Sequence, residues 1–261
     1  MNIDSNYRSV TPNYQNRSNS TNFTALHRGT YEFLSHKTPL RIYELEKGDL
    51  GFLEYFSKNL QKFFKKNKIE DDSRKQVIEE AVNASKEILK SDKEDKAKIF
   101  MAVSDKTPCG FFIGNVRKVG KDGKVCYSSR KNHSPNETEA DWVVTWKSGT
   151  GKPLGTEFFR SVLRDTKFKS AYVRSEVPEN SGAVEYYGKL GFKEIDNKYR
   201  KILGPHDNSY EIGQYDDVED YIVPMKVTRK GMADAIKRME KSAKYTEGTM
   251  YSTELDKNAL T

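Results

Sequence analysis

A glycine-rich turn at residues 149–155 is the part of this sequence whose residue types and spacing best suit phosphate binding. It connects an apolar stretch at 140–146 to a helical pattern at 154–164. The first turn of a helix carries free N–H groups and a partial positive charge, which attract phosphate. Glycine lets the backbone approach a ligand closely, and Pro153 fits a first helical turn because its missing N–H costs little there. The turn therefore indicates a site for a phosphate-bearing ligand.

The turn differs from two common nucleotide-binding motifs. Lys152 lies inside the glycine run and no Gly-Lys-Ser/Thr ending follows, which excludes a Walker loop. The glycine spacing is not that of a dinucleotide-binding fold, and no acidic residue closes a second strand at the required distance. Taken by itself, the turn is also compatible with a surface loop that begins a helix.

A second segment, residues 180–192, gives the turn a specific context. It resembles the second signature of the GNAT N-acetyltransferase superfamily, in which Asn is followed by Ala, Tyr and Gly-Phe at fixed spacings. The residues that match at every spacing are Asn180, Ala183, Tyr187, Gly191 and Phe192. The upstream turn is similar to the pyrophosphate loop of that family, with Gly155 at its last position. The resemblance spans residues 139–192, and the order of the predicted strands extends it to residues 40–227.

Two departures from the family's loop pattern affect the expected cofactor site. Thr150 stands where Arg or Gln is usual, and Pro153 stands where the first Gly is usual. Proline lacks the amide that would face a phosphate. The resemblance then implies that the diphosphate is held by the remaining residues of the loop, namely Thr150, Gly151, Lys152, Leu154, Gly155 and Thr156.

The resemblance implies that the ligand is acetyl-coenzyme A (acetyl-CoA), used as a co-substrate. In the family, main-chain groups of the strand before the loop pair with the pantetheine arm, and the matching residues here are Val143, Val144 and Thr145. Asn180 would lie beside that arm, and Tyr187 would point at the sulfur of the leaving thiolate. A phenol with a pKa near ~10 stays protonated at neutral pH, so Tyr187 would act as the general acid.

Three carboxylates are candidates for the base that takes a proton from the attacking amine, directly or through water. Alternate residues of a strand share one face, so Glu139 and Asp141 are expected to line up with Val143. Glu139 matches the position of a glutamate base in some family members, Asp141 lies nearer the thioester, and Glu176 ends the next strand. The sequence leaves the choice among them open.

The reaction expected is direct transfer of acetyl to a bound amine. Cys109 and Cys126 lie outside both motifs and have no convincing His partner, so a covalent acyl-enzyme is not expected. The acceptor expected is a protein or peptide amine, because the N-terminal extension, the insertion at 196–217 and the basic C-terminal helix suit a macromolecular substrate. Two alternatives remain: a small amine such as an antibiotic, polyamine or amino acid, and an inactive module that binds CoA.

The fold class expected is α/β (α+β), with a GNAT-like mixed, mostly antiparallel sheet and helices on both faces. Hydrophobic periodicity predicts helices at 49–64, 72–89, 154–164, 181–190 and 229–245. It predicts strands at 40–45, 98–103, 110–116, 125–127, 140–146, 171–174, 192–195 and 221–227. The family resemblance implies that the sheet splays between its fourth and fifth strands, which, with the strand at 125–127 left out of the count, are the strands at 140–146 and 171–174.

Three regions are expected along the chain. Residues 1–35 are rich in Asn, Ser and Thr, and we predict that they are disordered because they bury too little apolar surface. Their composition resembles the uncleaved secretion signals of type III bacterial effectors, which would make this a virulence protein that acts inside a host cell; otherwise a cytoplasmic location is expected. Residues 36–228 would form the acetyltransferase domain, and residues 229–261 a C-terminal helix and tail.

The overall composition narrows the remaining function classes. The net charge of +7 suits an anionic ligand or an acidic partner. Two cysteines and four scattered histidines give neither a disulfide framework nor metal-ligand spacing, so no metal is expected. No apolar run approaches the ~20 residues that span a bilayer, so no membrane partner is expected. No nucleic-acid-reading motif occurs either. The sequence does not predict the oligomeric state.

Overall fold

The computed structural model describes residues 25–34, 38–91, 97–115, 137–164, 170–177, 182–194, 221–248 and 250–251. Within these ranges, side chains are described except at residues 115, 137–142, 172, 174–177 and 221–224. Several sequence predictions therefore lie outside the described residues: the strand at 125–127, the insertion at 196–217, Asn180, and residues 1–24 of the predicted secretion signal.

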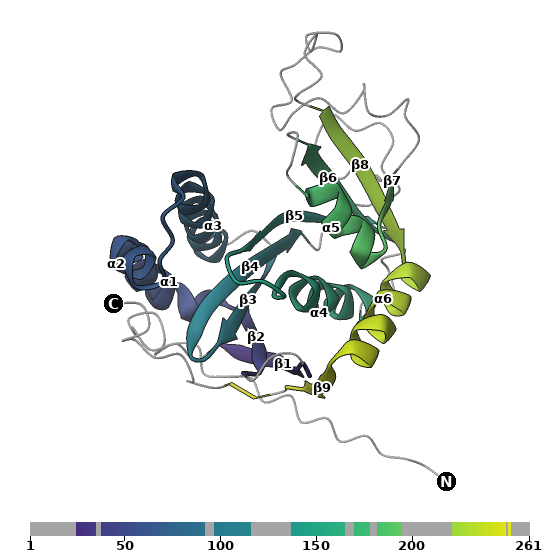
Figure 1. The fold of residues 1–261 in the computed structure, drawn as a ribbon, viewed down its shortest axis with the longest axis horizontal. Helices are drawn as coiled ribbons and strands as arrows, with labels where there is room; N and C mark the ends of the chain where they lie inside the picture. The colour runs from purple at the N-terminus through teal and green to yellow at the C-terminus, as the bar shows by residue number, and fades with distance from the viewer. Residues whose placement is uncertain are drawn as a thin grey trace.

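A nine-stranded sheet forms the centre of the described structure, in the order β7-β8-β6-β5-β4-β3-β2-β1-β9 (Figure 1). Neighbouring strands are antiparallel except β5 and β6, which are parallel. The strands are β1 (Leu26–Glu32), β2 (Leu40–Leu45), β3 (Ala97–Ser104), β4 (Thr107–Asn115), β5 (Glu137–Thr145), β6 (Ser170–Val177), β7 (Lys193–Glu194), β8 (Tyr221–Thr228) and β9 (Lys244–Glu247). A parallel pair requires a crossover connection, and the helix between β5 and β6 provides it.

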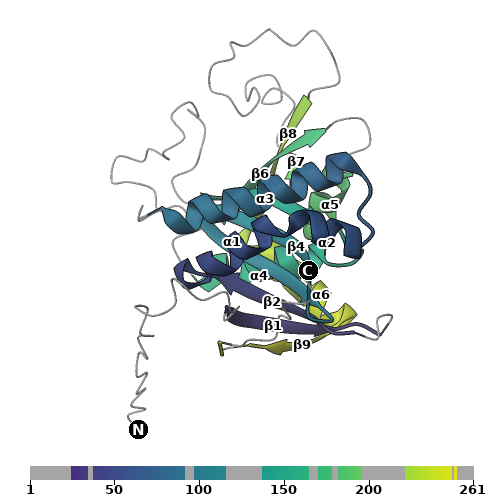
Figure 2. The ribbon, with the colours of Figure 1, turned by 90° about the vertical axis from the view of Figure 1, so that its left-hand side faces the viewer.

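Helices cover both faces of this sheet (Figure 2). One face carries α1 (Leu50–Lys58), α2 (Leu60–Lys66) and α3 (Asp72–Lys90), preceded by a short 3-10 helix, Lys47–Asp49. The other face carries α4 (Gly151–Arg164), α5 (Ala183–Leu190) and α6 (Arg229–Ser242). The mixed, mostly antiparallel sheet with helices on both faces confirms the predicted fold class.

Alternating side chains along the central strands create a separate core on each face. Phe111 belongs to the core under α1–α3, and its neighbour Phe112 belongs to the core under α4. The ring of Phe112 stacks on Phe158 of α4, with 4.8 Å between ring centroids. Complete burial of one such side chain contributes roughly 1.5–3 kcal/mol. Gly114 makes room for this packing, because a Cβ atom there would overlap the ring of Phe158. The apolar pattern of β4 therefore fixes where α4 lies.

Two segments that the sequence analysis left without strand structure pair with each other at one edge of the sheet. Residues 26–32, inside the predicted disordered segment 1–35, form β1, in which Tyr31 is fully buried. Residues 244–247, predicted to end the C-terminal helix and begin a tail, form β9 and pair with β1. The predictions were wrong here because both strands find their hydrogen-bond partners far away in the sequence, where local periodicity gives no signal.

The C-terminal helix belongs to the same core as the helices before it. The residues of α6 that face this core include Met232, Ile236 and Met239, the apolar stripe predicted from the sequence. Arg229, at the start of α6, donates a hydrogen bond to the carbonyl oxygen of Leu163 in α4 (2.7 Å). The predicted boundary at residue 228 therefore separates parts of the chain that pack together.

Candidate active site

The parallel strands β5 and β6 separate partway along their length (Figure 1). They pair only between residues 137–140 and 170–173. Beyond these residues, β5 continues to pair with β4 and β6 continues to pair with β8. Within the described ranges, no strand joins the two edges that face each other past this point. Their main-chain N–H and C=O groups are therefore available to an extended ligand.

A β-bulge in β5 marks the point where the two strands separate. Ala140 pairs with Gly114 and Trp142 pairs with Ile113, so Asp141 is the extra residue on β5. A bulge bends its strand and increases the local twist. The bulge therefore accounts for the way in which the second half of β5 diverges from β6.

The three candidate bases lie on the two strands that border the opening. Glu139 precedes the bulge, Asp141 forms it, and Glu176 lies on β6 beyond the paired region. The bulge interrupts the strict alternation from which Glu139 was expected to share a face with Val143. The choice of base stays a prediction, because these three carboxylates are not among the described side chains.

The loop between β5 and α4 is held against the end of β3. Thr150 is buried, and its hydroxyl donates to the carbonyl oxygen of Lys147 (2.8 Å). The Lys147 ammonium in turn donates to the hydroxyl of Ser104 (2.7 Å). Gly149 has a φ of 84°, which glycine adopts without strain. These contacts fix the position at which α4 begins, and they direct the Thr150 hydroxyl into the protein.

The first turn of α4 provides two free amides. The Leu154 amide donates to the carbonyl oxygen of Thr150 (3.3 Å), and Pro153 has no N–H. The amides of Gly151 and Lys152 have no acceptor within the part of the chain that the structure describes. The helix dipole adds positive potential at the same place. An anionic group bound there would satisfy both amides.

The other residues of the predicted cofactor loop face the interior. Leu154, Gly155 and Thr156 belong to α4 and are buried in the protein. This helix begins at Gly151 and not at residue 154 as predicted. The Thr156 hydroxyl donates to the carbonyl oxygen of Pro153 (2.9 Å). These residues therefore shape the helix, and the free amides lie only in its first turn.

Two glycines of α4 allow α5 to pack closely against its first turns. A Cβ atom on Gly151 would lie 2.6 Å from the ring of Tyr186, and one on Gly155 would lie 2.6 Å from the side chain of Leu190. The Tyr186 hydroxyl also donates to the carbonyl oxygen of Gly151 (2.8 Å). The sequence predicts ligand approach at these glycines and does not predict this packing role. The sequence did carry a signal for this packing. Gly151 and Gly155 are one helical turn apart, and so are Tyr186 and Leu190, so each of these pairs lies on one side of its helix.

Tyr187 is held in the core beside the first turn of α4. Its side chain is 7% exposed, and its ring meets those of Tyr186 (5.1 Å between centroids) and Phe192 (5.4 Å) nearly edge-on. Because Tyr186 contacts Gly151, the next residue is brought to the same end of α4. The turn and Tyr187 therefore lie at one place in the fold. The contact of Tyr187 with a sulfur atom stays a prediction.

Cys109 is unsuited to nucleophilic chemistry in this structure. Its side chain is 2% exposed, and its thiol lies 3.4 Å from the carbonyl oxygen of Ala102, to which it donates. Burial raises the pKa of the Cys109 thiol to about 12, so the reactive thiolate is scarce at neutral pH. Cys126 lies outside the described residues.

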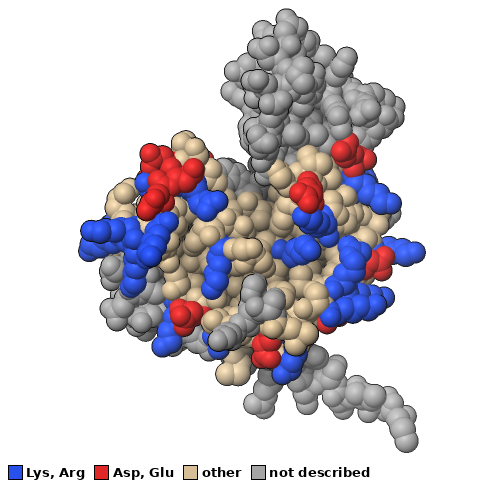
Figure 3. All heavy atoms as spheres, viewed as in Figure 1, with Lys and Arg blue, Asp and Glu red and all other residues tan. Residues whose placement is uncertain are grey.

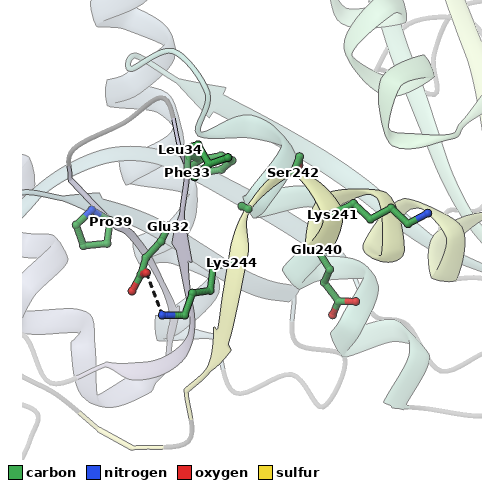
Figure 4. A pocket seen from close by; sticks show the side chains of 9 residues that line it. Glu32, Phe33, Leu34, Pro39, Glu240, Lys241, Ser242 and Lys244 are labelled. Atoms are coloured by element: carbon green, nitrogen blue, oxygen red, sulfur yellow. Dashed lines mark hydrogen bonds and ion pairs between the residues drawn. The ribbon is translucent and has the colours of Figure 1, made fainter.

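A hollow of about 630 Å³ lies elsewhere, where β1, α6 and β9 meet (Figure 4). Its lining includes Phe33 and Leu34 from the end of β1, and the ion pair between Glu32 and Lys244 (3.4 Å) borders it. Among the described residues, none of the predicted site residues lines this hollow. It is therefore separate from the opening between β5 and β6.

The described surface and side chains carry few other signs of a ligand. Figure 3 shows Lys and Arg gathered over α2 on the left and over α6 on the right of one face, with mostly uncharged surface between them. Within the described residues, no group of three or more His, Cys, Asp or Glu side chains is arranged to hold a metal ion. No described helix has the length and apolar character needed to span a membrane.

Comparisons with known proteins concern the fold. No protein-family model matches the sequence, and a search of curated proteins found no relative. An uncharacterised protein from Bacillus halodurans has a similar structure, with a TM-score of 0.51, 7% identity, and coverage of 84% of this chain and 98% of that chain. The likeness shows a shared fold.

Two other similar structures have names that state an activity. One is an acetyltransferase of the GNAT family from Streptococcus pneumoniae, with a TM-score of 0.40, 17% identity, and coverage of 72% of this chain and 98% of that chain. The other is an aminoglycoside N-acetyltransferase, with a TM-score of 0.42, 16% identity, and coverage of 74% of this chain and 98% of that chain.

Proposed function

We propose that this protein is an N-acetyltransferase that uses acetyl-CoA. The observation that carries the proposal is the separation of β5 from β6 directly before the free first turn of α4. An extended pantetheine arm needs main-chain partners along a strand edge, and a diphosphate needs convergent N–H groups. One continuous segment, residues 141–152, provides first the strand edge and then the free N–H groups.

The residues present fit the proposed ligand. The edge of β5 at Val143, Val144 and Thr145 faces the opening and would pair with the amides of the pantetheine arm. The Gly151 and Lys152 amides would donate to the diphosphate. The missing amide of Pro153 leaves this cradle with two donors, so we expect cofactor affinity to depend strongly on how those two are oriented.

The proposed reaction is direct aminolysis of the thioester. The amine nitrogen forms a bond to the carbonyl carbon, and the C–S bond then breaks with its electron pair moving to sulfur. Tyr187 would donate a proton to that sulfur, while Glu139, Asp141 or Glu176 would take a proton from the amine, directly or through water. The rest of the rate enhancement would come from holding the two reactants together.

The acceptor in this proposal is a protein or peptide amine. The basic surface over α6 supports it, because exposed cations there would attract an acidic protein surface around the target amine (Figure 3). A small-amine acceptor is the alternative. Delivery of the protein to a host cell by residues 1–30 is a further part of this proposal, and a translocation reporter with and without that segment would test it.

Titration calorimetry with acetyl-CoA, followed by a thiol-release assay, tests the function. We expect one molecule of acetyl-CoA to bind per chain, and free CoA to appear when a lysine-containing peptide mixture is added. Turnover with polyamines or aminoglycosides but not with peptides would favour the small-amine alternative. Binding without turnover on any amine would indicate an inactive CoA-binding module, and absence of binding would overturn the proposal.

A further inference from the structure

Tyr186 makes two contacts with the first residue of α4. Its hydroxyl donates to the Gly151 carbonyl oxygen at 2.8 Å, and its ring occupies the space that a side chain at Gly151 would need. The sequence predicts no role for Tyr186, and the proposed reaction does not use it. Its position next to Tyr187 in α5 nevertheless links two parts of the proposed site.

The geometry of the peptide bond gives the hydrogen bond a consequence for ligand binding. The carbonyl of Gly151 and the N–H of Lys152 belong to one planar peptide unit and point in opposite directions. A donor that holds the carbonyl therefore also sets the direction of the Lys152 amide. That amide is one of the two in the first turn of α4 that have no acceptor among the described residues.

Burial keeps Tyr186 in the form that can donate. Desolvation raises the pKa of the Tyr186 phenol well above its ordinary value, and the neighbouring Tyr187 raises it further. The hydroxyl therefore stays protonated throughout the physiological range. Nearby packing restricts its ring as well, since Tyr187 lies edge-on to it at 5.1 Å between centroids.

We propose that Tyr186 is a positioning residue that aims the Lys152 amide at the diphosphate of the acyl donor and fixes that amide relative to Tyr187. The inference rests on the proposed function. It extends that function by assigning diphosphate recognition partly to a side chain on α5 that touches neither the donor nor the reacting atoms. With Pro153 removing one of the usual donors, the orientation of the remaining amides matters more in this chain.

The test compares Tyr186→Phe with wild type in calorimetric titrations against acetyl-CoA and against acetyl-pantetheine, which lacks the diphosphate. We expect Tyr186→Phe to weaken acetyl-CoA binding about fivefold, the effect of one neutral hydrogen bond, and to leave acetyl-pantetheine binding unchanged. The matched control is Tyr251→Phe. It removes a 2.8 Å hydroxyl hydrogen bond to Glu46 near the opposite edge of the sheet, and we expect it to change neither affinity.

Two results would overturn the assignment of Tyr186: equal acetyl-CoA affinities of the variant and wild type, or equal weakening of both ligands. Wild-type protein that fails to bind acetyl-CoA would overturn the proposed function itself, and this is visible before any variant is made.

A second measurement on the wild-type chain makes the test independent of how well the variant folds. When CoA is added, the amide NMR resonance of Lys152 should shift downfield and its hydrogen exchange should slow. An unchanged Lys152 amide in protein saturated with CoA would contradict the proposal.

Discussion

Tyrosine hydroxyls perform different tasks at neighbouring points of this structure. Tyr186 donates to a backbone carbonyl, whereas Tyr31 donates to the carboxylate of Glu157 (2.6 Å). Burial raises the pKa of both phenols, so both remain donors. Tyr187 lies in the same core, one residue from Tyr186, and its proposed task requires it to lose a proton during the reaction. A single residue type thus serves packing, positioning and, in our proposal, proton transfer.

The proposed general acid predicts a selective loss of turnover. Tyr187→Phe keeps the ring between Tyr186 and Phe192 but removes the proton that would go to the thiolate. We expect kcat to fall about 100-fold, with acetyl-CoA affinity changed less than about twofold. Steady-state thiol release together with calorimetry checks this. A variant with wild-type kcat would remove Tyr187 from the mechanism.

The buried carboxylate of Glu157 predicts a pH-dependent stability. Glu157 is 1% exposed, and burial raises its pKa in spite of Tyr31 and of Arg160 at 3.3 Å. The folded state therefore holds this proton more tightly than the unfolded chain does. The stability that Glu157 contributes is complete below the unfolded pKa of about 4.3, and is lost as the pH rises through the higher folded value.

The isosteric variant Glu157→Gln cannot ionise, so its free energy of unfolding should increase relative to wild type as the pH rises from about 4. Urea denaturation of both proteins between acidic and neutral pH measures the difference. A difference that stays constant across this range, or that changes in the opposite direction, would contradict the explanation.

At the scale of elements, α4 is positioned from several sides. Its Phe158 stacks on Phe112 of β4, α5 packs on its first two turns, and Arg229 of α6 bonds to its last turn. The first turn follows the end of β5 that no longer pairs with β6. This arrangement leaves the amides at the start of α4 in a fixed place, which a diphosphate site requires.

Packing of α4 on β4 predicts a cost for enlarging Gly114. A Cβ atom at this position would overlap the Phe158 ring, so Gly114→Ala should lower the free energy of unfolding by about 1–3 kcal/mol. Denaturant unfolding measures the change. Phe158→Leu in the same chain should recover part of the loss relative to the sum of the single variants. Additive effects of the two changes would show that the contact does not limit packing.

At the scale of the whole molecule, the two ends of the described chain close one edge of the sheet. β1 pairs with β9, the ring of Tyr245 lies 5.0 Å from that of Tyr31, and the Arg160 guanidinium lies 3.8 Å above Tyr245. Glu157 and Arg160 of α4 thus meet side chains from both ends of the chain. The C-terminal segment is therefore part of the support for α4.

Removal of residues 244–261 should weaken this support. Loss of β9 and Tyr245 exposes the edge of β1 and leaves Tyr31 partly uncovered, so we expect a decrease of roughly 3 kcal/mol in the free energy of unfolding. Chemical denaturation gives the size of the effect, and faster amide exchange in β1 would locate it. A truncated chain with wild-type stability would show that β9 is dispensable.

Local signals in the sequence determined much of this fold. Stripes of apolar residues predicted the helices, and β-period patterns predicted the central strands, because both depend on neighbours within a few residues. The division of the predicted helix at 49–64 into α1 and α2 at Asn59 was not predicted. The turn at 149–155 and the segment at 180–192 indicated a site, because their chemistry depends on residue types at fixed spacing.

Only the tertiary structure decided which contacts those residues make. The pairing of β1 with β9, the bulge at Asp141 and the packing of Tyr186 on Gly151 each join residues that are distant in the sequence or depend on the register of a neighbouring strand. Local periodicity carries no information about such partners, since their free energy arises only when the chain has brought them together. The sequence thus indicated where a ligand should bind, and the packing of α5 on α4 determined how the amides that would hold it are oriented.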